Sequence, residues 1–110
     1  MTTLANDCEL YYSTLADDAD LAEIVELFVM ELPERLLKLN RAADRADWML
    51  VANLAHQIRG AGGSHGFAQL TPYAARLERT AREGEPEGAI RVALANLIDA
   101  CGRVRAGQPE

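Results

Sequence analysis

The chain has 110 residues and a mass of 12.0 kDa, with 49% hydrophobic and 5% aromatic residues. This length fits one compact domain without a separate catalytic domain beside it, and the apolar fraction excludes a wholly disordered chain. The formal net charge is −6, which argues against nucleic acid and against an anionic membrane surface as partners.

The charge is distributed unevenly along the chain. Residues 1–34 contain nine acidic residues and no basic ones, whereas residues 35–110 contain the other eight acids and all eleven bases. The first part therefore carries −9 (0 − 9) and the second +3 (11 − 8). The net charge of the whole chain thus says little about the charge of any one surface.

The composition favours helices, because Ala, Leu, Glu and Arg dominate and β-branched residues are scarce. Residues 1–17 are expected to form a flanking segment whose apolar side chains pack on the domain: Leu10, Tyr11, Tyr12 and Leu15. A first helix is expected to begin near Asp18 or Asp20, because either can cap its N-terminus. Apolar residues spaced by three and four then form one face: Leu21, Ile24, Val25, Phe28 and Leu32.

Pro33 fits poorly inside a helix, so we expect it either to kink the first helix or to open a second segment that runs to about residue 46. Asp47 predicts the N-cap of the following helix, which starts at Trp48. The apolar face expected for that helix is Val51, Leu54, Ile58 and Ala61.

Two more helices are expected in the last third of the chain. One begins near Thr71 and Pro72 and ends near Gly84, and the last begins after Pro86. The inward residues predicted for the last helix and its end are Ile90, Leu94, Leu97, Cys101 and Val104. The fold class is therefore all-α: an antiparallel four-helix bundle over residues 18–106, with a frayed tail over 107–110.

The sequence also predicts a cytoplasmic protein. The first residues lack the basic and apolar segments of a secretory signal, and no apolar run reaches the ~18–20 residues of a membrane span. Cys8 and Cys101 are far apart and lack the spacing of metal ligands, so we expect two reduced thiols, with Cys101 buried.

Four glycines fall within seven residues, at positions 60, 62, 63 and 66. A dinucleotide loop beginning at Gly60 would need glycine where His65 stands, and a phosphate loop would need a Gly-Lys-Ser/Thr ending that is absent. Two interpretations remain. Either the helix ends in a glycine-rich loop, or it continues and stays bare on one side so that a partner can approach closely.

Helical geometry favours a bare surface around His56. At about 100° per residue, His56 lies about 200° from Leu54, opposite the apolar face, with Ala52, Gly60 and Gly63 close by and Arg59 one turn along. An exposed imidazole among small side chains is suited to attack an electrophile on a large partner. His65 is half a turn out of phase, and we expect it to be partly buried and hydrogen-bonded.

The stretch His56-Gln57-Ile58-Arg59-Gly60, with Gly66 further on, resembles the His-x-x-Lys-Gly-x-x-x-x-x-Gly signature of histidine-containing phosphotransfer (HPt) domains. Glu31–Arg35, Asp47-Trp48 and Leu77-Glu78 resemble other parts of that family. The resemblance implies a four-helix bundle with an exposed histidine that carries phosphoryl groups in a His-Asp phosphorelay, without an ATP site or enzymatic activity. Arg59 departs from the usual lysine, and His65 from a hydrophobic residue.

The resemblance further implies roles for single residues. His56 accepts the phosphoryl group, Arg59 offsets charge on its oxygens, and Glu78 accepts a hydrogen bond from the second ring nitrogen. The expected partner contacts are Ala52, Gln57, Gly60 and Gly63. The implied partners are receiver domains or a hybrid histidine kinase, the chain is expected to be a monomer without its own cofactor, and Mg²⁺ would come from the receiver. The alternative is an unphosphorylated docking module that regulates a receiver or kinase.

Overall fold

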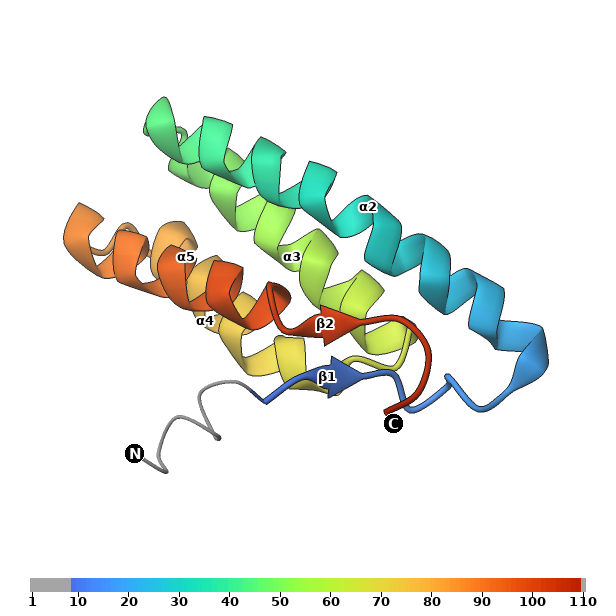
Figure 1. Cartoon of the computed structure of the whole chain (residues 1–110). Helices are drawn as coiled ribbons and strands as arrows, with labels where there is room; N and C mark the ends of the chain where they lie inside the picture. The colour runs from blue at the N-terminus through green and yellow to red at the C-terminus, as the bar shows by residue number, and fades with distance from the viewer. Residues whose placement is uncertain (1–8, 110) are drawn as a thin grey trace.

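The structure is a computed structural model that describes residues 9–109. Four α-helices form a bundle: α2 (Ala19–Asp44), α3 (Trp48–Ser64), α4 (Thr71–Arg82) and α5 (Glu87–Cys101). A 3-10 turn, η1 (Ala68–Leu70), leads into α4. Figure 1 shows α3 running back along α2, and α5 running back along α4. None of the helices in the described part of the chain is long and apolar enough to cross a membrane.

Helix α2 continues through Pro33 instead of restarting there. Its N-cap is Asp18, whose carboxylate accepts a hydrogen bond from the Asp20 amide at 2.9 Å. Leu32 and Leu39, before and after the proline, are both buried. Packing on both sides of the proline therefore offsets the lost helical hydrogen bond, and the predicted second segment is the C-terminal half of one long helix.

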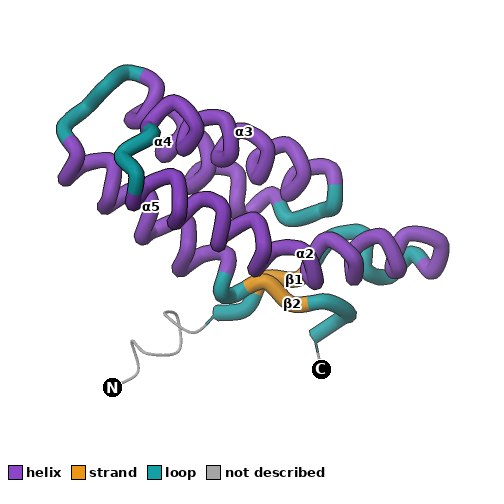
Figure 2. The backbone as a smooth tube through the Cα atoms, turned by 90° about the horizontal axis from the view of Figure 1, so that it is seen from above, coloured by secondary structure: helices purple, strands orange, loops and turns teal. Residues whose placement is uncertain are grey.

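Helix α3 lies against both α2 and α4, as the view from above shows (Figure 2). Asp47 caps it as predicted, accepting from the Leu50 amide at 3.2 Å. Its buried residues are Val51, Ala52, Ala55, Ile58 and Gly62. The predicted face was thus only half right, since Leu54 and Ala61 are partly buried, and the true core face is turned toward α4.

Two short strands, β1 (Tyr11–Tyr12) and β2 (Val104–Arg105), pair in parallel and join the two ends of the described chain. The all-α prediction missed them, because two residues are too few to show the alternation of a strand. In the flanking segment, Leu15 packs against the core as predicted, whereas Leu10 is exposed.

The C-terminal half of the bundle agrees closely with the prediction made from the sequence. All five predicted inward residues of the last helix and its end are buried. Thr71 is the first residue of α4 rather than its cap, because η1 precedes it. Cys101 is a free, buried thiol as predicted, and its burial raises its pKa to about 12, whereas Cys8 lies outside the described residues.

Candidate functional site

His56 projects from the middle of α3 into solvent, with 57% of its side chain exposed. The cap at Asp47 fixes where α3 begins, and the burial of Ala55 and Ile58 on either side of His56 fixes how the helix is turned. The sequence-based placement of His56 on the outside of the helix is therefore confirmed.

A carboxylate from the neighbouring helix contacts the imidazole. Glu78 Oε2, on α4, lies 3.1 Å from His56 Nδ1. Arg59 Nη2 lies 3.1 Å from the same ring nitrogen and 3.5 Å from Glu78 Oε1. Arg82 Nη2 also donates to Glu78 Oε2, at 3.2 Å. The structure thus brings together His56, Arg59 and Glu78, the three residues to which the family resemblance assigned the chemistry.

Glu78 is held in its ionised form. Burial by itself raises the pKa of this carboxyl, but the hydrogen bond with His56, the charge of Arg59 and the hydrogen bond from Arg82 together lower the pKa below its ordinary value. An ionised carboxylate is an acceptor only, so its contact with Nδ1 requires a proton on that nitrogen. In that tautomer Nε2 carries the free lone pair, and the Arg59 guanidinium interacts with Glu78 rather than with the ring.

The four glycines of α3 and the turn after it serve two different purposes. Gly60 and Gly63 are exposed, and a methyl group added at either would meet nothing within 4 Å. By contrast, a Cβ at Gly62 would lie 3.3 Å from Leu70 Cδ1, and Gly66 has a φ of +86° with its Cβ position against Ser13 and Thr14. Packing and backbone geometry therefore explain Gly62 and Gly66, but not Gly60 and Gly63.

Of the predicted partner contacts, Gln57, Gly60 and Gly63 are exposed, but Ala52 is fully buried. The prediction for Ala52 is wrong, because α4 packs over that side of α3. Alanine at this position lets the two helices approach closely, and no partner can reach its side chain.

His65 has a structural environment. It is partly buried at the C-cap of α3, where its Nδ1 donates to the Ala61 carbonyl at 2.6 Å. Its ring stacks on Phe28 with centroids 5.0 Å apart, and its own carbonyl accepts from Ser13 Oγ. The predicted hydrogen-bonded, partly buried histidine is confirmed, and its aromatic ring takes the place of the hydrophobic residue usual in the resembled signature.

The sequence interpretation counted Arg82 among the cations near the active helix but did not predict its contact with Glu78. Its spacing of four residues from Glu78 on one helix was the available signal, because such pairs lie on the same face. The residues that the structure describes contain no cluster of three or more His, Cys, Asp or Glu side chains arranged to hold a metal ion.

A scan against protein-family models matches the Hpt domain over residues 23–107. The chain belongs to the Hpt domain family. The match spans nearly all of the four helices and includes His56, Arg59 and Glu78. The family identifies the chain as a phosphotransfer module of two-component signalling. Searches of curated proteins and of solved structures gave no match.

Proposed function

We propose that the chain is an intermediate of a His-Asp phosphorelay, in which His56 accepts a phosphoryl group from an aspartyl phosphate on a receiver domain and passes it to another receiver. The observation that carries this proposal is the exposed His56 ring with Nδ1 held 3.1 Å from an ionised Glu78. Membership of the Hpt family supports it. The chain acts in this proposal as a phosphocarrier and a monomer, and the donor is a receiver or a hybrid kinase.

The chemistry needs only the free nitrogen of the ring. The Nε2 lone pair attacks phosphorus in line, an N–P bond forms, and the P–O bond to the aspartyl group breaks to restore the receiver's carboxylate. The proton on Nδ1 stays in place, so the imidazole becomes cationic as the bond forms. Glu78, at 3.1 Å, stabilises that cation, and the same steps in reverse transfer the group onward.

Arg59 supplies positive charge one turn along α3 from His56. Its side chain is 39% exposed and its Nη2 lies near both the ring and Glu78, so in this proposal a rotation about its side-chain bonds brings the guanidinium to the phosphoryl oxygens. A guanidinium can hold two of these oxygens at once. The Mg²⁺ ion that accompanies such a transfer belongs, in this proposal, to the receiver.

A matched pair of histidine variants tests the proposal. The chain is incubated with a panel of receiver domains carrying radiolabelled phosphoryl groups, and label on the chain is followed with time. The wild type and His65→Gln should accept label, whereas His56→Gln should not. Label on His56→Gln would contradict the assignment, and a folded wild type that accepts none from any receiver would favour the unphosphorylated docking module.

A further inference from the structure

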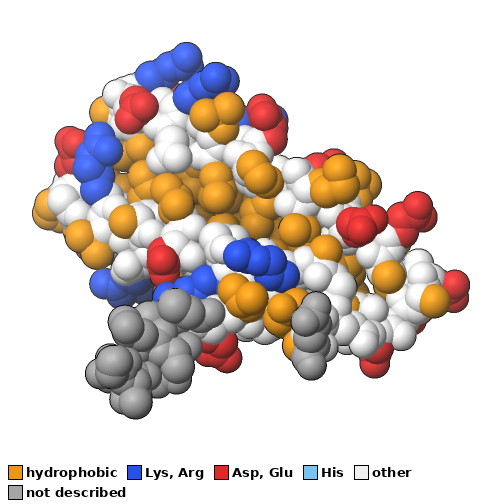
Figure 3. Space-filling view, viewed as in Figure 1, with side chains coloured by type: hydrophobic (Ala, Val, Ile, Leu, Met, Phe, Trp, Pro, Cys, Tyr) orange, Lys and Arg blue, Asp and Glu red, His pale blue; other side chains and the backbone are white. Residues whose placement is uncertain are grey.

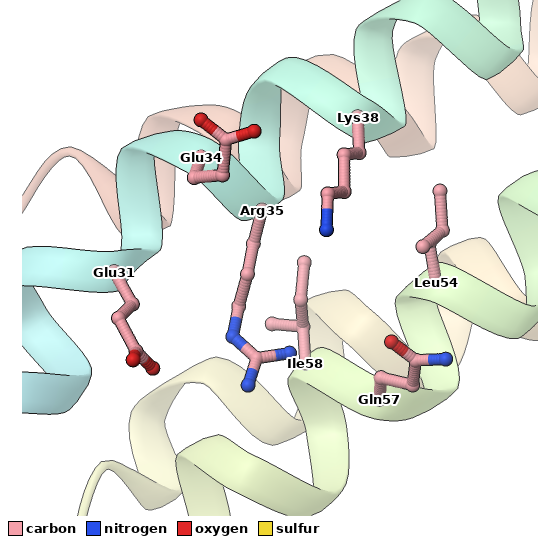
Figure 4. Close-up of a pocket in the computed structure, with 7 residues that line it drawn as sticks. All are labelled: Glu31, Glu34, Arg35, Lys38, Leu54, Gln57 and Ile58. Atoms are coloured by element: carbon pink, nitrogen blue, oxygen red, sulfur yellow. The ribbon is translucent and has the colours of Figure 1, made fainter.

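A groove of about 430 Å³ runs between α2 and α3 (Figure 4). Gln57, the residue next to His56, forms part of its wall, and Leu54 and Ile58 contribute apolar surface. Two cations from α2, Arg35 and Lys38, extend into it. The groove thus combines apolar walls with positive charge on the side of α3 that faces α2, whereas His56 lies on the side that faces α4.

The cations in this groove have no anionic partner among the described residues. Neither Arg35 nor Lys38 makes an ion pair there, and Arg35 Nε is buried without any hydrogen-bond partner. On the other side of His56, Arg59 and Arg82 both pair with Glu78. Arg79 of α4 also makes no ion pair among the described residues, but Arg35 carries a buried donor without an acceptor, and such a donor favours a ligand that supplies one.

Two acids of α2, Glu31 and Glu34, also line the groove, four residues before Arg35 and Lys38. They could compete for the cations, but their carboxylates make no ion pair in the described structure, and Figure 4 shows the Glu34 carboxylate turned away from the groove. Exposed pairs at this spacing are weak and screened by salt. These two acids therefore leave Arg35 and Lys38 available to an incoming carboxylate.

We propose that this groove binds an acidic side chain of the receiver that docks on His56, and so fixes the orientation in which the receiver presents its phosphoryl group. This inference rests on the proposed function. A carboxylate is the matching chemistry, because the guanidinium of Arg35 can hold both of its oxygens and Lys38 adds a second charge. A receiver is the matching source, because a standard interface of about 800 Å² per partner, centred on His56, extends over the adjacent groove.

The test uses the phosphorylated receiver that transfers fastest to the wild-type chain. Initial transfer rates over a range of receiver concentrations give KM and the maximal rate. Arg35→Gln and Lys38→Gln should each raise KM about tenfold and leave the maximal rate within about twofold. Glu34→Gln should lower KM, because it removes a negative charge from the surface that an acidic side chain approaches. Arg76→Gln, which removes one positive charge from an exposed position on α4, should leave KM unchanged.

Phosphorylation by phosphoramidate, a small donor that needs no docking, separates the groove from the chemistry. All four variants should be labelled by it at the wild-type rate. An unchanged KM for both Arg35→Gln and Lys38→Gln, or an equal rise for Arg76→Gln, would overturn the proposed groove while the proposed function stands. Failure of the wild type to accept from either donor would overturn both. A receiver Asp→Lys or Glu→Lys variant that restores transfer to Arg35→Glu would identify the bound side chain.

Discussion

Replacing Gly60 and Gly63 by alanine should make the protein more stable and less active. Both glycines lie inside α3, where glycine costs about 0.8–1 kcal/mol relative to alanine. A methyl group at either position would meet nothing within 4 Å. Nothing in the fold therefore opposes the gain, and the double variant should be about 1.6–2 kcal/mol more stable, which raises Tm by about 6–8 °C for a domain of this size.

The same two methyl groups would stand on the surface that a docked receiver must approach. Overpacking a close interface costs about 1–3 kcal/mol, so transfer from a phosphorylated receiver should slow by about five- to 150-fold. The rate of phosphorylation by phosphoramidate should not change, because this small donor does not have to pack against the α3 surface around Gly60 and Gly63. Gly62→Ala provides the control, since its Cβ would lie 3.3 Å from Leu70 Cδ1 and should not stabilise the fold.

Thermal unfolding followed by circular dichroism and transfer rates with both donors check this prediction. A double variant that is more stable and still accepts from receivers at the wild-type rate would show that the bare surface has no role in docking. A double variant less stable than the wild type would contradict the helical environment described for the two glycines.

Three further predictions concern stability and reactivity. Gly66→Ala should lose about 2 kcal/mol or more in urea unfolding, because its φ is +86° and the added Cβ would strike Ser13. Glu78→Gln should slow transfer, and its free energy of unfolding should fall less steeply than that of the wild type as the pH is lowered. The lowered pKa of Glu78 stabilises the folded wild type above pH 4.5, the ordinary pKa, and this stabilisation is lost as the pH falls below 4.5 and through the lowered pKa. In a Cys8→Ser background, Cys101 should resist thiol reagents at about pH 8 until the protein unfolds, since burial raises its pKa to about 12; rapid labelling of the folded protein would contradict this.

The outward orientation of His56 was predictable, because a capped helix has a fixed period and a known start. The environment of His56 was not. Glu78 is 22 residues away on another helix, and only the packing of α4 on α3 brings its carboxylate to Nδ1. The resemblance to a family named the residue, but the hydrogen bond that fixes the tautomer needed the structure.

The error at Ala52 has a physical cause. The core direction of α3 was estimated from its large apolar side chains, whereas two small residues, Ala52 and Ala55, are both fully buried and turn the core face toward α4. Small residues give little signal in a periodicity, yet they mark where two helices come nearest. Whether Ala52 is exposed or buried depends on where α4 packs, and the position of α4 cannot be predicted from the sequence of α3 alone.

The fold shows where the unevenly distributed charges of the sequence lie on the molecule. Four of the nine acids of residues 1–34 lie on the first half of α2, and Figure 3 shows acidic side chains toward the N-terminal end of that helix and basic ones toward the opposite end of the bundle. Arg35 and Lys38 stand just past the point where the sign changes along the chain. The net charge of −6 therefore hides cations in the groove between α2 and α3 that suit an acidic partner.

The central claim is that His56 accepts a phosphoryl group on Nε2 while Glu78 holds the proton on Nδ1. Nitrogen-15 NMR of the histidine rings, recorded before and after phosphorylation by a receiver, measures both points at once. The account predicts that the Nε2 signal of His56 alone shows coupling to phosphorus, with Nδ1 protonated and the His65 signals unchanged. Phosphorylation at Nδ1, or at His65, would contradict it.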